Sequence, residues 1–463
     1  MFRTPIILVD DEKDQLDKLN MAFALSGLPC LPILYTSENE TGIDHITSDT
    51  EHARIIALDI NLRGEQDPTD AKRLYSPIEK VLEKLKPTGP YYLLFWSRYK
   101  DLPEQIIILL STRSKDVVPA PIGWGFLDKT DFQDPGSSDE LKRKLLEVVS
   151  EVKIFNLLLE WEGRTRRAAS YTLSELYKIA ATPHDNGWKI EETRKRLITL
   201  ITHIAHEAVG NKNSKTAPNH AVETGLLPIL EDNLLDMTSA DSVGRLNDEW
   251  ASCLSKLGNP AGLESLSEED TSRLNSFYNL EELPDTYSKC KRGVFVNSAY
   301  TDLTDHQKFL KTFGAHTEGF GLSDLVREEF VFKANTDERN AVISASMYGW
   351  LEIGAACDHA QLKNKLHRYL FGMLIPAEFQ SYLYDGSRNL KDRAHAGIYR
   401  SPILRYREKP YILFLSFRYQ IGVHPGSDLL GVSLFRMKDH IMNEITFNWS
   451  KYSIRPGITS FRQ

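Results

Sequence analysis

The chain has 463 residues, of which 41% are hydrophobic and 26% charged, as in ordinary soluble globular proteins. Its charge is uneven: the net charge is −8 overall, −7 over residues 1–150 and +7 over residues 331–463, which indicates different partners for the two ends or an attraction between them. It has no apolar run long enough to span a bilayer, no signal-peptide pattern and only four widely separated cysteines, so we expect a cytoplasmic protein without a disulfide framework.

Residues 1–150 alternate between apolar runs and helical patterns. The apolar runs that read as strands are IILVD (6–10), LPILYT (31–36), RIIALDI (54–60), YYLLFWS (91–97) and GWGFLDK (123–129). The segments with helical patterns are DQLDKLNMAFALSG (14–27), SPIEKVLEKLK (76–86), LPEQIIILLST (102–112) and SDELKRKLLEVVSEV (138–152). This alternation predicts an α/β fold with a doubly wound, five-stranded parallel sheet.

Polar side chains end these predicted strands: Asp10, Asp11, Asp59, Ser97 and Lys129. In parallel α/β sheets, ligands collect at the carboxyl ends of the strands. Three carboxylates that converge there would form a hard-oxygen site suited to Mg²⁺. An ionised aspartate beside a divalent cation can attack a phosphoryl group, whose oxygens a hydroxyl and an ammonium can hold. The alternative is that the acidic run at 10–12 is a solvated loop edge.

Four motifs of this segment resemble those of the receiver domain of two-component response regulators. They are LVDDE (8–12), LDINLRG (58–64), FWS (95–97) and GFLDK (125–129). The resemblance implies a flavodoxin-like strand order and a bound Mg²⁺. It implies that Asp10 and Asp11 bind the metal directly or through water, that Asp59 is both phosphoacceptor and ligand, and that Asn61 offers its backbone carbonyl.

The same resemblance implies that Ser97 and Lys129 contact the phosphoryl group and that Phe126 is the switching aromatic residue. Two positions depart from the family pattern, since Arg63 and Thr130 stand where proline is common. The separations of Asp59, Ser97 and Lys129 along the chain are also longer than usual. A degenerate receiver that serves only as a docking module is the alternative.

A rival alignment makes IIILLST (106–112) the fourth strand and Ser111 or Thr112 the hydroxyl residue. We prefer Ser97, because Pro103 is well placed to begin a helix.

Residues 151–300 are predicted to form a helical domain, with IEETRKRLITLITHIAHEAVG (190–210) as its clearest helix. His203, His206 and Glu207 lie on that helix, but their order is not that of a metallopeptidase motif, so we favour a solvated or packed face. The polar segment at 210–220 is predicted to be a loop.

Residues 301–463 are predicted to form an α+β domain with an antiparallel sheet or small barrel. In this part of the chain and just before it, the predicted strands are 292–298, 329–335, 340–346, 349–357 and 409–417. The predicted helices are 361–374 and 434–452.

The segment CDHAQ (357–361) has residues of chemical interest. In a strand, Cys357 and His359 would share a face, but a cysteine nucleophile needs a base within reach and a metal needs a further ligand. Only the fold could bring such a residue near, the candidates being His367, His395 and His424. We favour instead a strand-to-helix corner at which Asp358 caps the following helix.

The expected function is that of a phosphorylation-controlled signalling protein. A histidine-kinase-like protein would donate the phosphoryl group, and the C-terminal region would bind a protein or nucleic-acid target. Basic and aromatic side chains suited to nucleic acid lie around one predicted strand: Arg400, Arg405, Arg407, Lys409, Arg418, Tyr399, Tyr406 and Tyr411. The alternative for these residues is a surface balanced by acidic neighbours.

The whole chain, with EIGAACDHAQ (352–361) and RPGITSFR (455–462), loosely resembles bacterial response-receiver proteins associated with conflict and anti-phage systems. That resemblance implies a role in antiviral defence. A receiver-gated enzyme with a catalytic site in residues 300–463, or a pseudo-receiver scaffold, are the alternative functions.

Overall fold

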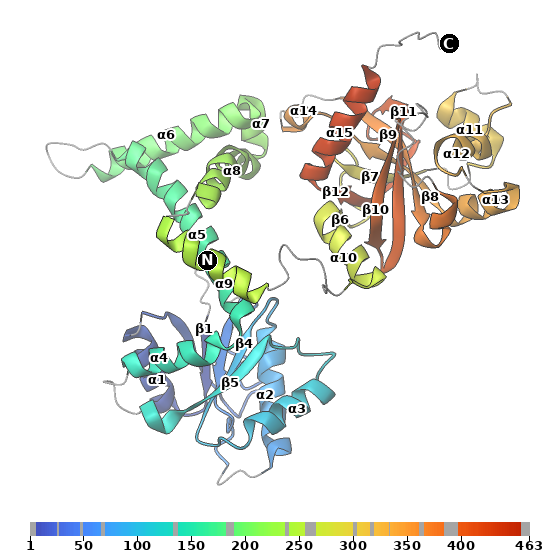
Figure 1. Ribbon diagram of the computed structural model, residues 1–463. Coiled ribbons are helices and arrows are strands. Elements are labelled where there is room, and N and C mark those ends of the chain that lie inside the picture. Colours follow the sequence, from blue (N-terminus) through green and yellow to red (C-terminus); the bar gives the residue numbers. More distant parts are fainter. Residues whose placement is uncertain are drawn as a thin grey trace. The chain divides into compact units, whose positions relative to one another are not determined.

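The computed structural model in Figure 1 forms two compact units, residues 1–173 with 230–258, and residues 174–229 with 259–463. The described residues are 6–25, 27–46, 50–65, 70–132, 138–181, 189–236, 240–254, 265–299, 303–314, 319–332, 334–360, 365–383 and 397–454. Within these ranges, no helix has the length and apolarity needed to cross a membrane.

The first unit is built on a five-stranded parallel sheet, which confirms the fold class predicted for this part of the chain. Its strands are β1 (Ile6–Asp10), β2 (Cys30–Leu34), β3 (Ile55–Leu58), β4 (Tyr92–Ser97) and β5 (Gly123–Asp128). Their spatial order is β2-β1-β3-β4-β5, and all neighbouring pairs run parallel.

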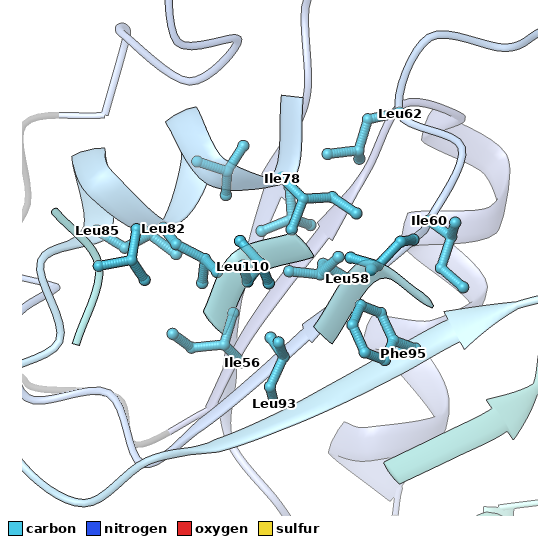
Figure 2. Packing of buried hydrophobic residues seen from close by; sticks show 14 of the residues in the cluster. Ile56, Leu58, Ile60, Leu62, Ile78, Leu82, Leu85, Leu93, Phe95 and Leu110 are labelled. Carbon is cyan, nitrogen blue, oxygen red and sulfur yellow. The ribbon is translucent and has the colours of Figure 1, made fainter. Parts of the chain in front are cut away.

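Helices cover both faces of this sheet: α1 (Lys13–Leu25), α2 (Ala71–Leu85), α3 (Pro103–Arg113) and α4 (Ser138–Ser150). On one face, α2 and α3 pack on the inward side chains of β3 and β4, as Figure 2 shows. The labelled residues of this core are Ile56, Leu58, Ile60, Leu62, Ile78, Leu82, Leu85, Leu93, Phe95 and Leu110. On the other face, α1 and α4 pack on alternate residues of the same strands. Burial on both faces explains why these strands are continuously apolar.

Helix α2 begins earlier than predicted. We expected a start near Pro77, but the helix begins at Ala71, because the Asp70 side chain accepts a hydrogen bond from the backbone N–H of Lys72 at 3.0 Å. It ends at Leu85, and its C-cap Lys86 has a φ of +47°, in the left-handed region.

The first unit extends beyond its sheet into α5 (Lys153–Ala180), a helix of 28 residues. Phe155 near its start is fully buried and stacks on Tyr92 of β4, with 6.1 Å between ring centroids. About two turns later, Glu162 accepts a hydrogen bond from Nε of Arg54 at 2.9 Å. The beginning of α5 is therefore part of the core under the sheet. Helix α9 (Ala240–Cys253) belongs to the same unit.

The predicted loop at 210–220 is wrong. Helix α6 (Ile190–Val209) is followed at once by α7 (Asn211–Thr216) and α8 (Pro218–Asp236). Gly210, with φ of +82°, turns the chain between α6 and α7. Ala205, Val209 and Ala221 then pack together, so apolar contacts between helices outweigh the polar composition of the turn.

The second unit contains a seven-stranded antiparallel sheet in the order β10-β11-β9-β8-β7-β12-β6. The strands are β6 (Leu280–Glu282), β7 (Val294–Ser298), β8 (Met347–Glu352), β9 (His367–Pro376), β10 (Ile398–Tyr406), β11 (Lys409–Val423) and β12 (Leu430–Met437). The antiparallel sheet predicted for this region is confirmed.

Helices also cover this second sheet. Four of them lie between residue 268 and β8: α10 (Glu268–Asn279), α11 (His306–Phe313), α12 (Leu322–Glu329) and α13 (Thr336–Ala345). A short helix, α14 (Ala356–Ala360), follows β8, and α15 (Asp439–Ser453) follows β12. Side chains of α11, α12 and α13 form one core with the sheet, and Ile441, Met442 and Ile445 of α15 contribute to the other.

Several elements of this unit differ from the prediction. Residues 340–346 lie mostly in α13, not a strand, because Asn335 and Glu338 form a capping box that starts a helix. The predicted strand at 329–335 is the end of α12 followed by a single bridge at Val331. The predicted helix at 361–374 is in its described part strand β9, and the predicted helix at 434–452 begins with the end of β12.

Candidate phosphoacceptor and metal site

Three carboxylates meet at the carboxyl end of the parallel sheet. Asp10 ends β1, Asp11 follows it, and Asp59 follows β3. The Asp59 N–H donates a hydrogen bond to the Val9 carbonyl of β1 at 2.9 Å, which continues the pairing of the two strands. One oxygen from each of the three carboxylates lies within 4.8 Å of the others. Asp10 and Asp59 are buried, with 0% and 3% of their surface exposed, while Asp11 is half-buried. The pairing of β1 with β3 thus brings together the acids that the sequence places far apart.

Lys129 lies among these carboxylates. It follows β5 and begins a short 3₁₀ helix, Lys129–Phe132. Its Nζ donates hydrogen bonds to Asp59 at 2.5 Å and to Asp10 at 3.4 Å, and only 4% of its side chain is exposed. Strand β5 thereby places the ammonium group against the two buried acids. The contact of Lys129 with a phosphoryl group, which the GFLDK motif implies, stays a prediction.

Backbone N–H groups orient the buried acids. Glu12 N–H donates to Asp10 Oδ1 at 2.8 Å, and Asn61 N–H donates to Asp59 Oδ1 at 3.2 Å. The Asn61 side chain exchanges two hydrogen bonds with the backbone of Glu65, both of 3.0 Å, which holds the loop after β3 closed. The Asn61 carbonyl accepts a hydrogen bond from Gly64 N–H at 3.1 Å and keeps a second lone pair for another partner.

Ser97 ends β4, the strand between β3 and β5, and is fully buried. Its Oγ is among the buried side-chain atoms of the described residues that have no hydrogen-bond partner. A buried hydroxyl without a partner is costly, so such a group at a strand end is well suited to a ligand oxygen. Residues 106–112 lie in α3, where the exposed hydroxyls of Ser111 and Thr112 donate to the Ile108 carbonyl, so the fourth strand is the one that ends at Ser97.

Phe126 lies in β5, three residues before Lys129. Its ring is half-buried and packs on the core formed with α2 and α3.

The site holds more negative than positive charge, and burial together with this charge raises the pKa of two of its acids, Asp10 and Asp11. Burial, followed by repulsion from Asp59, raises the pKa of Asp10 to about 7 and that of Asp11 to about 6. Burial acts to lower the pKa of Lys129, but the attraction of Asp59 and Asp10 outweighs it and the pKa of Lys129 is raised. An all-oxygen donor set with surplus negative charge fits Mg²⁺.

No family model, curated protein or solved structure matches this chain. The interpretation of the site therefore depends on its own geometry. That geometry brings together Asp10, Asp11, Asp59 and Lys129, and it places Ser97 at the end of the strand between β3 and β5.

We expect the stability of the first unit to depend on pH through Asp10. An aspartate of the unfolded chain titrates near pH 3.9, whereas Asp10 in the fold has a raised pKa of about 7. The folded state therefore binds this proton more tightly, and the stabilisation is lost as the pH rises through 7. Asn at position 10 cannot ionise, so only the wild type should lose this stabilisation. In thermal unfolding in EDTA, without Mg²⁺, the Tm of Asp10→Asn minus that of the wild type should therefore increase from pH 5 to pH 8.

Asp101→Asn provides the control, because Asp101 is an exposed aspartate of the same unit. Its Tm difference from the wild type should stay constant over the same pH range. A constant difference for Asp10→Asn as well would contradict the raised pKa of Asp10.

The other residues considered from the sequence do not join this site. His203, His206 and Glu207 lie on α6 and form no cluster of three metal-ligating side chains within the described ranges. His424 is exposed, and His395 lies outside the described residues.

The strand-to-helix corner predicted at CDHAQ is present, since β8 ends at Glu352 and α14 begins at Ala356, but the predicted cap is wrong. Cys357, Asp358 and His359 lie inside α14, so Asp358 is not the cap of a following helix. Sequence reasoning missed Glu352, which ends the apolar strand MYGWLE and lies beside His359 and His367. The signal that could have identified it is a carboxylate at the end of an apolar strand, the same pattern that identified Asp10 and Asp59.

Three of the basic residues around β10 and β11 have acidic partners. Arg405 pairs with Glu408 at 2.8 Å, Arg407 with Asp285 at 2.9 Å, and Arg418 with Glu329 at 2.6 Å. Two of the tyrosines among them are buried: Tyr399 and Tyr406. These contacts favour the alternative of a surface balanced by acidic neighbours.

Proposed function

We propose that this chain is a phosphorylation-controlled signalling protein whose first unit is a receiver-like domain. The observation that carries the proposal is the position of Asp59, which lies with two further carboxylates, a buried ammonium and, on the adjacent strand end, an unpartnered hydroxyl. The strand order 2-1-3-4-5, which is that of flavodoxin-like folds, supports it.

Asp59 would be the phosphoacceptor. One of its carboxylate oxygens would attack the phosphorus atom of the donor, forming a new P–O bond while the bond to the donor's leaving group breaks. Asp10, Asp11 and Asp59 would hold Mg²⁺, with the Asn61 carbonyl as a further ligand. Mg²⁺ would neutralise charge on the phosphoryl oxygens. Lys129, now bonded to Asp59, would then pair with the phosphoryl group.

The added phosphoryl group would carry about two negative charges and would require new donors. The Ser97 hydroxyl, buried and without a partner, would donate to one phosphoryl oxygen. Phe126, now half-buried, would move inward with it. This change would shift a two-state equilibrium and alter the affinity for a partner of the C-terminal region. A histidine-kinase-like protein would be the phosphodonor.

The test is adduct formation on the full-length chain. Incubation with acetyl phosphate and Mg²⁺ should raise the intact mass by one phosphoryl group, and beryllofluoride with Mg²⁺ should raise the Tm. Asp59→Asn should abolish both effects, because no carboxylate remains to form the bond. Asp101→Asn, at an exposed position, should leave both unchanged.

Two serine variants test the strand assignment in the same assay. Ser97→Ala should weaken beryllofluoride binding, whereas Ser111→Ala, on the exposed side of α3, should have no effect. An unchanged mass together with no Mg²⁺-dependent rise in Tm would contradict phosphorylation and favour the pseudo-receiver, which only docks.

A further inference from the structure

A second cluster of metal-ligating side chains lies at one end of β8 in the antiparallel sheet. Its members are Glu352, the last residue of β8, His359 in α14, and His367, the first residue of β9. Strands β8 and β9 are antiparallel neighbours, and the hydrogen bond from Ile353 N–H to the Arg368 carbonyl at 2.9 Å continues their pairing. The start of β9 therefore lies beside the end of β8, and α14 turns His359 back toward both.

The donor atoms of this cluster face one another. His359 Nε2 lies 2.8 Å from one oxygen of Glu352, and His367 Nδ1 lies 3.1 Å from the other. Bonds of about 2.0–2.2 Å from these atom types to a zinc-like ion, at angles of roughly 90–110°, would place neighbouring donors roughly 2.9–3.5 Å apart. Two of the three donor pairs thus already have the spacing expected around a shared ion, and the three ligand atoms all lie within 4.8 Å of one another.

Glu352 is completely buried, and among the described residues its ion-pair partners are these two histidines. A buried carboxylate is costly unless its charge is balanced. Neutral imidazoles would each offer it one N–H donor but no charge, whereas a divalent cation would balance the carboxylate directly. The His359 side chain is 14% exposed, so the cluster reaches solvent on that side.

Gly354 leaves space beside the donor atoms. Its N–H donates to Glu352 at 3.0 Å, so the backbone passes close to the cluster. A Cβ atom at this position would lie 2.5 Å from His359 Nε2 and 2.7 Å from Glu352 Oε1. Any larger residue would fill the space next to both atoms, which is a common reason for glycine at a ligand site.

We propose that Glu352, His359 and His367 bind a divalent transition-metal ion, with Zn²⁺ as the reference ion. Two imidazoles and one carboxylate select such ions over Mg²⁺ and Ca²⁺, which prefer oxygen donors. Within the described ranges, no further histidine, cysteine, aspartate or glutamate joins the three. Three protein ligands leave a coordination position for water, as in catalytic zinc sites and unlike closed structural sites. This inference is independent of phosphorylation at Asp59.

Cobalt is a suitable probe, because Co²⁺ bound by imidazole nitrogen and carboxylate oxygen absorbs visible light. The full-length chain, freed of metal by chelation, should bind one equivalent of Co²⁺ with a new visible band in the presence of excess Mg²⁺, which would occupy the oxygen site of Asp10, Asp11 and Asp59. Addition of Zn²⁺ should remove the band.

His359→Ala should lower the Co²⁺ affinity at least tenfold, because it removes one of the three ligands, and its position in a short helix is only partly buried. Gly354→Ala should lower it as well, because its Cβ would occupy the space beside the donors. His424→Ala is the matched control, since it removes an exposed histidine of the same unit and should leave the titration unchanged.

Circular dichroism and the Tm without metal establish that each variant is folded. His359→Ala is the decisive variant, because His359, unlike the completely buried Glu352, is partly exposed and its loss is less disruptive to folding. Absence of a visible band in the full-length chain, or an equal band in folded His359→Ala, would overturn the proposal and leave a hydrogen-bonded triad in which both imidazoles donate to Glu352.

Discussion

Lys129→Ala should lower the free energy of unfolding of the first unit by about 3–5 kcal/mol at pH 8 without Mg²⁺. Lys129 is the cation that contacts the buried acids directly, at 2.5 Å from Asp59 and 3.4 Å from Asp10. Its removal would leave those carboxylates buried without a charge partner. At pH 5 one of these carboxylates would take up a proton and lose its charge, so the loss of unfolding free energy should be smaller than at pH 8.

Lys144→Ala is the matched control. Lys144 also pairs with an aspartate, Asp131 at 2.8 Å, but the two side chains are 33% and 49% exposed. An exposed pair contributes about 0–1 kcal/mol, so this variant should unfold almost as the wild type does. Urea unfolding at both pH values, with hydrogen exchange of the β4 amides to localise the change to the first unit, would measure both variants. Equal losses for the two lysines would contradict the balancing role of Lys129.

Phe95→Ala should cost about 3–5 kcal/mol, because it removes a buried ring from the core shown in Figure 2. Phe95 is completely buried and lies among Leu58 and Leu93 of the same core, with Trp124 as an aromatic neighbour at 6.3 Å between ring centroids. The surrounding strands are paired on both sides and can close the resulting cavity only in part.

Ile108→Ala is the corresponding control, since Ile108 lies on α3 with 55% of its surface exposed. Its loss should change the stability by no more than about 0.5 kcal/mol. The same urea titration would compare the two variants. A small loss of unfolding free energy for Phe95→Ala would contradict the prediction. It would mean that the core beneath the site repacks easily around the missing ring.

The parallel sheet and its site were predictable because their signals are local. Each strand is a continuous apolar run that ends in a polar residue, and parallel strands bring such ends together whatever the length of the helices between them. Asp10, Asp59 and Lys129 could therefore be placed at one edge without knowledge of any contact. By contrast, no local sequence pattern specifies the order of the strands or shows that the Ser97 hydroxyl has no hydrogen-bond partner. Both become visible only in the folded chain.

The antiparallel unit was harder to predict because its signals are ambiguous or distant. Strand β9, HRYLFGMLIP, is buried along almost its whole length and has lost the alternation that marks a strand. Helix α13 contains β-branched residues but is started by the capping box of Asn335 and Glu338. The approach of His367 to Glu352 depends on the register of β8 with β9, which no local pattern encodes.

The burial of Phe155 determines where this chain can be divided. A fragment that stops at residue 150 would end with α4 and would leave Tyr92 without its stacked ring and Arg54 without Glu162. The exposed apolar surface would favour aggregation, and a loss of activity in such a fragment would say nothing about Asp59. A fragment intended to isolate the sheet should therefore continue past Glu162, with its end on the exposed part of α5.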